Sequence, residues 1–203
     1  MKLFYLLISA AFYVLSYSPF NYKFLIFLSL VIFLKVIEDV SFKNKIRYIF
    51  FYAFLVHSFG VSWVSESLMT YGLMSMAESI IVTAFFIIII SLPYILIALF
   101  HKPIKKNGIS NINLFAVTFL VVEYIKSLVF GGFPWLLIGN SQNGTIFNLM
   151  YPVFGTFMVS YTVVLMSTLF YKSYCVKQKQ YILLSIILGV TYLSTYFKSD
   201  IEE

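Results

Sequence analysis

The sequence predicts an all-α, polytopic integral membrane protein: a helix bundle of about seven transmembrane helices, with the N-terminus in the cytoplasm and the C-terminus across the membrane. Three observations support this class. Hydrophobic residues make up 61% of the 203 residues and charged residues 11%, against roughly 45–50% and about 25% in soluble domains. The apolar residues form long runs, and the basic residues gather on one side of those runs.

Seven apolar runs correspond to the expected spans. A spanning helix takes about 20 residues, so seven spans use about 140 and leave no room for a separate soluble domain of normal size. We therefore expect residues 1–203 to form a single transmembrane domain. Long unbroken runs favour helices over barrel strands, because barrel strands alternate in polarity. The runs are residues 3–18, 24–37, 48–64, 79–100, 114–129, 147–171 and 181–197.

The basic residues predict the orientation. Eleven of them fall on the cytoplasmic side if the N-terminus is cytoplasmic, and three fall on the other side. This asymmetry follows the positive-inside rule. The first run resembles a signal peptide, but a second apolar run follows at once, so we expect it to be retained as a span. The eleven are Lys2, Lys35, Lys43, Lys45, Arg47, Lys102, Lys105, Lys106, Lys172, Lys177 and Lys179; the three are Lys23, Lys126 and Lys198.

Two charged residues interrupt the fifth apolar run. Glu123 lies near its middle, and Lys126 follows three residues later on the same helix face. A charge inside a span is costly and marks a functional hypothesis by default. An intramembrane ion pair that locks helices together, or a Lys126 that extends toward the interface, is the structural interpretation. The functional interpretation is a polar cavity for a lipid or a peptide.

Residues 130–144 form the most unusual segment, because glycines, a proline, a tryptophan and a polar cluster lie close together. Pro134 fixes its own φ and favours an extended residue before it. Trp135 and, at the end of the third run, Trp63 are typical interface anchors. An apolar loop of this kind folds back into the interface or lines a cavity.

No cofactor or metal site is expected. His57 and His101 fall on different spans at opposite depths, without further ligands at metal-binding spacing. The single cysteine, Cys175, falls in an expected cytoplasmic loop. Nucleic acid is not expected as a partner, since the aromatic and basic residues near Tyr48 fit a membrane boundary better.

Four motifs occur in the order found in one family. They are Ser18-Pro19-Phe20, similar to A-P-F; residues 60–64, similar to G-x-x-W-V; residues 123–142, similar to E-x-x-R, G-F-P-W and G-x-S-Q; and residues 152–155, similar to P-x-x-G. On these residues the chain resembles the membrane half of bacterial apolipoprotein N-acyltransferase over essentially its whole length. The third motif is the most specific, because glycine, proline and tryptophan rarely coincide at that spacing.

This resemblance implies a transmembrane module for phospholipid-to-lipoprotein N-acyl transfer, in the bacterial inner membrane, with a periplasmic C-terminus. In the family a nitrilase-like domain follows the seventh span and carries the Glu-Lys-Cys catalytic set. That domain is not recognised in these 203 residues, so no catalytic residue is assigned, and the chain is expected to be inactive alone. The implied partners are a membrane phospholipid and a lipoprotein. Two alternatives stay open for the catalytic part: the chain is an N-terminal fragment from a split or interrupted gene, or it works with a separately encoded nitrilase-like catalytic chain.

The resemblance also implies residues that shape a lateral opening for lipid. Phe133 and Trp135 are expected to pack against lipid tails. Glu123 is expected to hold the loop by pairing with Lys126 or with a backbone amide. Lys126 departs from the arginine of the family, which weakens bidentate pairing. The candidate substrate and lipid-access residues are Trp63, Glu123, Phe133, Pro134, Trp135 and Gln142.

Two other function classes remain open at this point. One is a non-catalytic lipid-binding or assembly protein that reuses the scaffold. A nitrilase-like reading frame immediately downstream in the DNA would argue against this class. The other is a small transporter, whose support is weak because no inverted repeat is visible and only Glu123 is clearly placed within a span.

Overall fold

The computed structural model describes residues 1–104 and 109–176, together with 186, 189 and 192. Within these residues the chain is helical and contains no strand, which confirms the all-α class. The elements are α1 (Lys2–Leu15), α2 (Leu25–Ile37), α3 (Phe42–Val61), α4 (Val64–Gly72), α5 (Met76–Ser91), η1 (Leu92–Ile95), α6 (Leu96–Phe100), α7 (Ile109–Leu128), η2 (Val129–Gly131), η3 (Ile138–Gln142), η4 (Ile146–Leu149) and α8 (Tyr151–Val176).

Three stretches of the described chain are long and apolar enough to cross a membrane: Met76–Phe100, Ser110–Leu128 and Tyr151–Cys175. The bent pair α3 and α4 brings the number to four if it forms one span. Helices α1 and α2 are apolar but shorter. The seventh expected run, residues 181–197, lies outside the described residues except for 186, 189 and 192.

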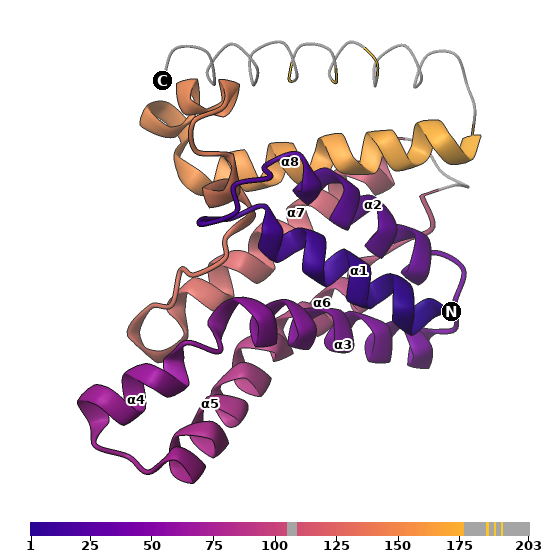
Figure 1. Cartoon of the computed structure of the whole chain (residues 1–203). Helices are drawn as coiled ribbons and strands as arrows, with labels where there is room; N and C mark the ends of the chain where they lie inside the picture. The colour runs from indigo at the N-terminus through magenta and orange to yellow at the C-terminus, as the bar shows by residue number, and fades with distance from the viewer. Residues whose placement is uncertain (105–108, 177–185, 187–188, 190–191, 193–203) are drawn as a thin grey trace.

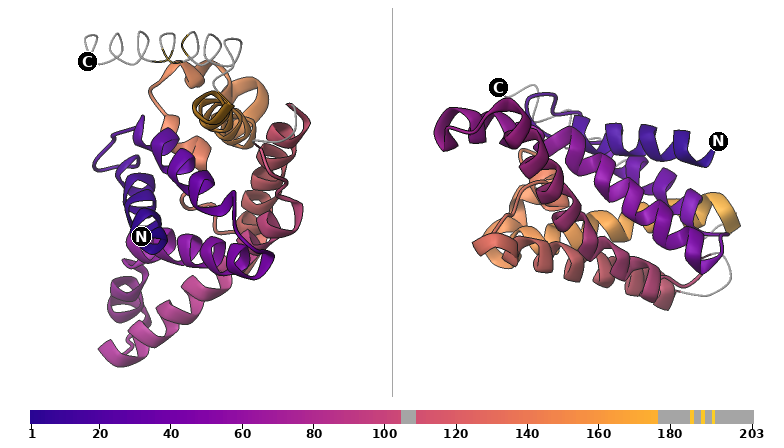
Figure 2. Two further views of the ribbon diagram at one scale, coloured as in Figure 1. Left: turned by 90° about the vertical axis from the view of Figure 1, so that its right-hand side faces the viewer. Right: turned by 90° about the horizontal axis from the view of Figure 1, so that it is seen from below.

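The helices form a bundle from which one hairpin projects. Helix α1 packs on α2 and α3, α7 packs on α8, and α2 also contacts α8. Helices α4 and α5 form the hairpin that extends away from the body in all three views (Figures 1 and 2). The chain from η2 to η4 lies at one end of the bundle, and the N-terminus lies at the other (Figure 1).

Small hydroxyl residues allow α1 and α2 to approach closely. The Ser9 hydroxyl donates to the Ser29 carbonyl at 2.7 Å, and the Ser29 hydroxyl donates to the Ser9 carbonyl at 2.6 Å. The Tyr52 hydroxyl of α3 lies 3.0 Å from the Ser29 hydroxyl. Reciprocal hydrogen bonds between small residues are a common way to join helices in lipid. They fix the face of α1 that carries Tyr13, one turn after Ser9.

Two breaks in the helices have local causes. Pro93 has no amide hydrogen, and the chain passes through η1 between α5 and α6 at this point. Helix α8 is interrupted at Gly155, whose φ of 70° is readily adopted only by glycine. Helices α3 and α4 bend by 49° without a proline, at Ser62 and Trp63.

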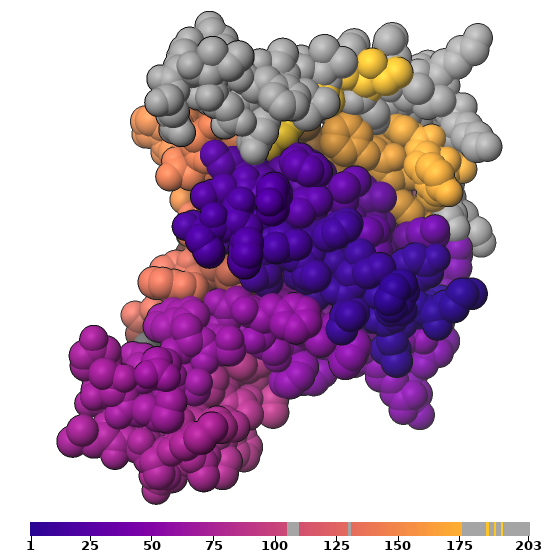
Figure 3. Space-filling view, in the orientation of Figure 1, coloured from indigo at the N-terminus to yellow at the C-terminus, as the bar shows by residue number. Residues whose placement is uncertain are grey.

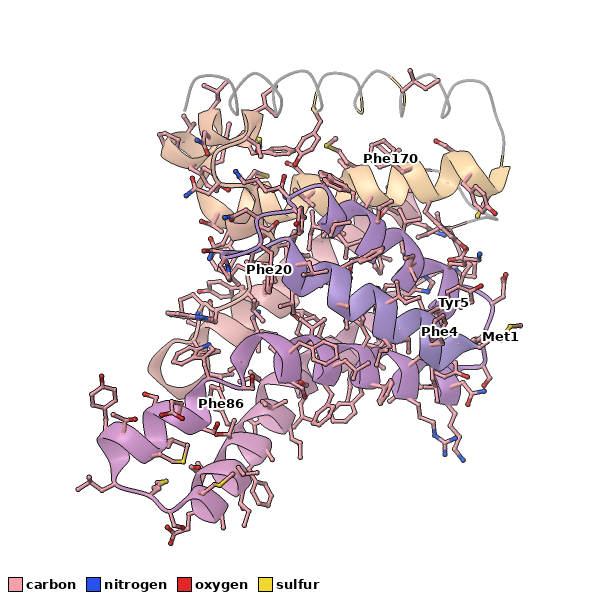
Figure 4. All side chains as sticks on the ribbon, viewed as in Figure 1. Met1, Phe4, Tyr5, Phe20, Phe86 and Phe170 are labelled. Atoms are coloured by element: carbon pink, nitrogen blue, oxygen red, sulfur yellow. The ribbon has the colours of Figure 1, made fainter. Side chains whose placement is uncertain are left out.

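Large apolar side chains cover the outside of the bundle. Met1, Phe4 and Tyr5 lie at the end of α1 opposite to Phe20 (Figure 4), and the first three are exposed, as is Phe20. Side chains of this kind on an outer face are expected for helices that contact lipid.

Candidate functional site

An irregular segment, residues 133–137, connects η2 to η3 at one end of the bundle and contains a turn at residues 135–136 (Figure 1). Gly132 has a φ of 115° and Leu136 a φ of 54°, so the chain leaves the helical conformation on both sides of Pro134. Leu136 and Leu137 are nevertheless buried. Irregular backbone among spanning helices is stable only where its polar groups find partners inside the protein. We call residues 133–139 the inner segment.

A lysine and a tyrosine bind the first carbonyl groups of the inner segment. The Lys126 ammonium, on α7, donates to the carbonyl of Trp135 at 2.8 Å and to that of Leu136 at 3.2 Å. The Tyr13 hydroxyl, on α1, donates to the same Leu136 carbonyl at 2.9 Å. Lys126 and Tyr13 are both fully buried, so two separate helices fix one carbonyl.

Two further tyrosines bind the later carbonyl groups. The Tyr17 hydroxyl donates to the Leu137 carbonyl at 2.9 Å, and the Tyr151 hydroxyl donates to the Gly139 carbonyl at 2.6 Å. The tyrosine ring is apolar and its hydroxyl is polar, which suits a group that must reach backbone inside a lipid-facing bundle. Side chains from α7, from α8 and from α1 or just beyond it therefore bind the carbonyls of residues 135, 136, 137 and 139.

Buried acceptors bind the amide groups of the inner segment. The Glu123 carboxylate accepts a hydrogen bond from the Ile138 amide at 2.6 Å, and the Ser160 hydroxyl accepts one from the Gly139 amide at 2.8 Å. Glu123 is fully buried. Within the described residues its carboxylate makes no ion pair with Lys126. The two charged residues therefore act on the segment, one on an amide and the other on carbonyls.

Gly139 lets the inner segment lie directly against α8. A Cβ at this position would collide with the carbonyl oxygen of Thr156 and would lie 3.1 Å from the Ser160 hydroxyl oxygen. The position therefore needs glycine because the α8 backbone comes so close to it. Its φ lies outside the left-handed region, so backbone conformation is not the reason.

Four aromatic side chains lie together where the inner segment meets the α4–α5 hairpin. The ring centroids of Trp63 and Trp135 are 5.4 Å apart, and Phe133 stacks on Trp135 at 5.8 Å. Phe86, on α5, meets Phe133 edge to face at 4.8 Å. Trp63 is 46% exposed and Trp135 49% exposed. This aromatic cluster therefore presents apolar surface at the edge of the bundle.

A cavity of about 530 Å³ lies beside the aromatic cluster. Its size is within the range of small-molecule sites. The surfaces of the α1–α2 connection and of the η2–η4 region adjoin on this side of the molecule (Figure 3). We call it the loop cavity. It is lined by Val14, Ser16, Tyr17, Ser18, Asn21, Lys23, Gly60, Trp63, Pro134, Trp135, Leu136, Asn140, Ser141 and Asn143.

Gln142 joins three parts of the chain behind the cavity. Its side-chain amide donates to the Lys23 carbonyl at 3.1 Å and to the Ser141 hydroxyl at 2.9 Å. Its side-chain carbonyl accepts from the Tyr192 hydroxyl at 2.9 Å. Gln142 is fully buried, so it fixes the α1–α2 connection against η3.

The structure brings all six predicted site residues to one end of the bundle, in two groups. Trp63, Pro134 and Trp135 line the loop cavity, and Phe133 stacks on Trp135. Glu123 and Gln142 are buried and hold backbone. Sequence reasoning missed the residues that complete the site. These are Tyr13, Tyr17, Lys23, Tyr151 and Ser160; the spacing of Tyr13 and Tyr17, four residues apart in an apolar run, was the available signal.

Comparison with known proteins identifies the family. The family model described as "Apolipoprotein N-acyltransferase N-terminal domain" matches residues 9–169. The apolipoprotein N-acyltransferase of Pasteurella multocida is 28% identical over 160 residues, which are 78% of this chain and 30% of the relative. That of Methylococcus capsulatus is 28% identical over 158 residues, 76% and 31% of the two chains. That of Coxiella burnetii is 26% identical over 173 residues, which are 81% of this chain and 35% of the relative. The chain thus spans about a third of the length of these relatives, and it belongs to the apolipoprotein N-acyltransferase family, in the region of its N-terminal domain.

Proposed function

We propose that this chain is the membrane domain of an apolipoprotein N-acyltransferase and provides the site at which phospholipid and lipoprotein reach the transferring machinery. One observation carries the proposal. Buried side chains from three regions of the bundle hold an irregular backbone segment in place, and that segment presents the aromatic cluster and the loop cavity. Such a structure is a preformed site and differs from a simple connecting loop.

The six candidate residues take two roles in this proposal. Trp63, Phe133 and Trp135 contact acyl chains, because their rings form exposed apolar surface beside a cavity. Pro134 restricts the backbone between Phe133 and Trp135, because its ring fixes φ. Glu123 and Gln142 are positioning residues, since they touch backbone and not the cavity.

The acyl-transfer chemistry belongs, in this proposal, to a nitrilase-like domain in the same polypeptide or a separate one. Acyl transfer through a covalent intermediate needs an activated nucleophile such as a thiolate. Cys175, the single cysteine of the sequence, lies near the end of α8 that is remote from the η2–η4 region (Figure 1). We therefore assign no catalytic role to it.

The proposed topology has seven spans in the bacterial inner membrane, with a cytoplasmic N-terminus and the loop cavity toward the periplasm. The asymmetry of the basic residues supports it, as does the position of the tryptophans at the cavity, where interface anchors are expected.

A transfer assay tests the proposed function. The purified chain is mixed with phospholipid carrying a labelled acyl chain and with a diacylated lipopeptide acceptor, with and without the nitrilase-like domain of a relative. We expect no labelled lipopeptide from the chain by itself and transfer when both parts are present. Robust turnover by the 203-residue chain without the added domain would contradict the proposal.

A further inference from the structure

We propose that the α4–α5 hairpin anchors the bundle at the membrane surface: its tip, residues 71–76, lies in the headgroup layer, and α5 enters the hydrocarbon just after the tip. The partner of this surface is the lipid bilayer itself. The inference goes beyond the proposed function, because it concerns residues 65–85, outside the four sequence motifs, and it requires no acyl transfer.

The first half of α5 has the reverse polarity of a hairpin that stands in water. Ser79 and Thr83, one turn apart, are buried, while apolar side chains on the other faces are exposed. At about 100° per residue, the exposed positions cover roughly 200° of the helix circumference, whereas a stripe of about 100° is enough to pack against one protein element. Lipid covers such a surface from all sides. The exposed apolar residues are Ile80, Ile81, Val82, Phe85, Ile88 and Ile89.

The change from polar to apolar surface falls within one turn of α5. Ser75 and Glu78 form a capping box, in which the Ser75 amide donates to the Glu78 carboxylate at 2.9 Å. Glu78 is exposed, and the exposed Ile80 and Ile81 follow it directly. A carboxylate is costly in hydrocarbon and exposed isoleucines are costly in water, so the edge of the hydrocarbon lies between them. The stretch Met76–Phe100 is long and apolar enough to cross the membrane from this point.

Leu73 at the tip combines an unfavourable backbone conformation with almost complete exposure. Its φ of 53° lies in the left-handed region, which glycine and asparagine adopt more readily than leucine. Its side chain is nevertheless 90% exposed. Neither the turn nor contact with water favours leucine here, but a lipid interface does, because it removes the side chain from water. Tyr71, 85% exposed, lies two residues earlier, and tyrosine is typical of the interface.

Helix α4 keeps a polar face beside the tip. Glu66 and Thr70 lie one turn apart and are both exposed, and the Thr70 hydroxyl donates to the Glu66 carboxylate at 3.4 Å. A carboxylate is excluded from hydrocarbon. Glu66 therefore lies on the water side of the hairpin, where it serves as an internal reference for measurements at the tip.

The same placement sets the depth of the aromatic cluster. Phe86, which contacts Phe133, follows Glu78 by eight residues, or about 12 Å along the α5 axis. With Glu78 at the headgroups, the cluster lies near the boundary between headgroups and acyl chains, where tryptophan is typical. The hairpin tip and the aromatic cluster thus contact one leaflet at two depths.

Two labelled positions on the hairpin test this placement. In a Cys175→Ser background, the full chain carries a nitrobenzoxadiazole fluorophore on Met76→Cys, at the exposed tip, or on Glu66→Cys, and is reconstituted in phosphatidylcholine vesicles. Lipids with a nitroxide at the headgroup or deep in the acyl chain quench from the lipid side, and iodide on both sides of the membrane quenches from water. We expect the headgroup nitroxide to quench the Met76 label about threefold more than the Glu66 label, and iodide to show the reverse order.

Substitutions at Leu73 separate lipid contact from folding. Leu73→Asn tolerates the left-handed conformation and removes the apolar contact, so it is expected to lower headgroup quenching of the Met76 label about threefold without changing thermal unfolding. If Leu73→Asn unfolds more easily, Leu73→Gly replaces it, because glycine adopts this conformation without strain. Leu73→Met is expected to keep the quenching. Leu99→Asn, an exposed leucine at the other end of the same span, is the matched control and is expected to leave quenching at the tip unchanged.

Each contrary result overturns the inference in a different way. Equal access of iodide to both labels, without headgroup quenching, would show that the hairpin stands in water. Strongest quenching of the Met76 label by the deep nitroxide would place the tip inside the hydrocarbon. Unchanged quenching in both Leu73→Asn and Leu73→Gly would remove the anchoring contact. Shielding of the label only after addition of a relative's nitrilase-like domain would make the tip a protein-docking surface. The acyl-transfer assay tests the proposed function independently of all these results.

Discussion

The Glu123 carboxylate on α7 accepts a hydrogen bond from the backbone amide of Ile138, fifteen residues further along the chain, at 2.6 Å. Lys126, on the same helix, donates to the carbonyls of Trp135 and Leu136. Adjacent parts of the inner segment therefore meet a fixed acceptor and a fixed donor. Charged groups this deeply buried are stable only when hydrogen-bonded, and the backbone of the segment provides these bonds.

Removal of the Glu123 carboxylate is expected to destabilise the bundle. In Glu123→Ala the Ile138 amide loses its acceptor, and Lys126 loses a compensating negative charge, which costs about 2–3 kcal/mol. Glu123→Gln keeps an oxygen acceptor and is expected to cost about half as much. The measurement is equilibrium unfolding in mixed detergent micelles. Val121→Ala, on the exposed face of the same helix, is the control; equal stability of Glu123→Ala and this control would refute the prediction.

The Leu136 carbonyl receives two donors, and their removal is expected to be cooperative. Lys126→Met leaves the Tyr13 donor, Tyr13→Phe leaves the Lys126 donor, and the double variant leaves neither. We predict a double-variant cost that exceeds the sum of the single costs by about 0.5–3 kcal/mol. Tyr13→Phe combined with Ser167→Ala, a buried hydroxyl bonded within α8, is expected to be additive. Additivity in both pairs would show that the two donors do not share one carbonyl.

Glycine at position 139 is required by the Thr156 carbonyl. Gly139→Ala is expected to cost about 1–3 kcal/mol or more, because backbone must move to admit the methyl group. Gly72→Ala is the matched control, since its Cβ would meet only side-chain atoms at 3.8 and 3.9 Å. This control is expected to be neutral or to stabilise by up to about 1 kcal/mol. Thermal unfolding of the two variants checks the contrast, and a stable Gly139→Ala chain would contradict the close approach.

The proposed orientation is tested with introduced cysteines in a Cys175→Ser background. Asn143 and Lys43 are both exposed and lie at opposite ends of the bundle in this proposal. Asn143→Cys is expected to react with a membrane-impermeant maleimide in intact spheroplasts, and Lys43→Cys only after permeabilisation. The reverse pattern would invert the topology.

Sequence periodicity predicts the helices well because lipid imposes a simple rule, that long apolar runs form helices. The expected span 24–37 corresponds to α2 (Leu25–Ile37), and 114–129 to much of α7. The third run is different: it contains no proline, yet the chain bends by 49° after Val61 and continues as α4. A bend of this kind depends on the packing of α3 and α4 against α5. Local sequence patterns do not predict such packing.

The residues of the site also divide into those that the sequence predicts and those that depend on tertiary contacts. The tryptophans and Glu123 could be selected from sequence, since buried charge and interface aromatics are recognisable by type. The bond between Tyr13 and Leu136 joins residues 123 positions apart, and the position of Lys23 beside Gly144 depends on the same long-range folding. Contacts of that kind follow from tertiary structure and have no signature in a single sequence.

Acyl transfer in the reconstituted system is the most direct test of the proposed role of this domain. Labelled phospholipid, lipopeptide acceptor and the nitrilase-like domain of a relative are combined with the wild-type chain, with Trp135→Ala or with the control Lys43→Gln. We predict that Trp135→Ala lowers the initial rate by about tenfold, because a half-exposed aromatic contact of this size contributes about 1.4 kcal/mol, and that Lys43→Gln leaves the rate unchanged. A Trp135→Ala chain that supports transfer at the wild-type rate would contradict the assignment of the aromatic cluster as the lipid-access site.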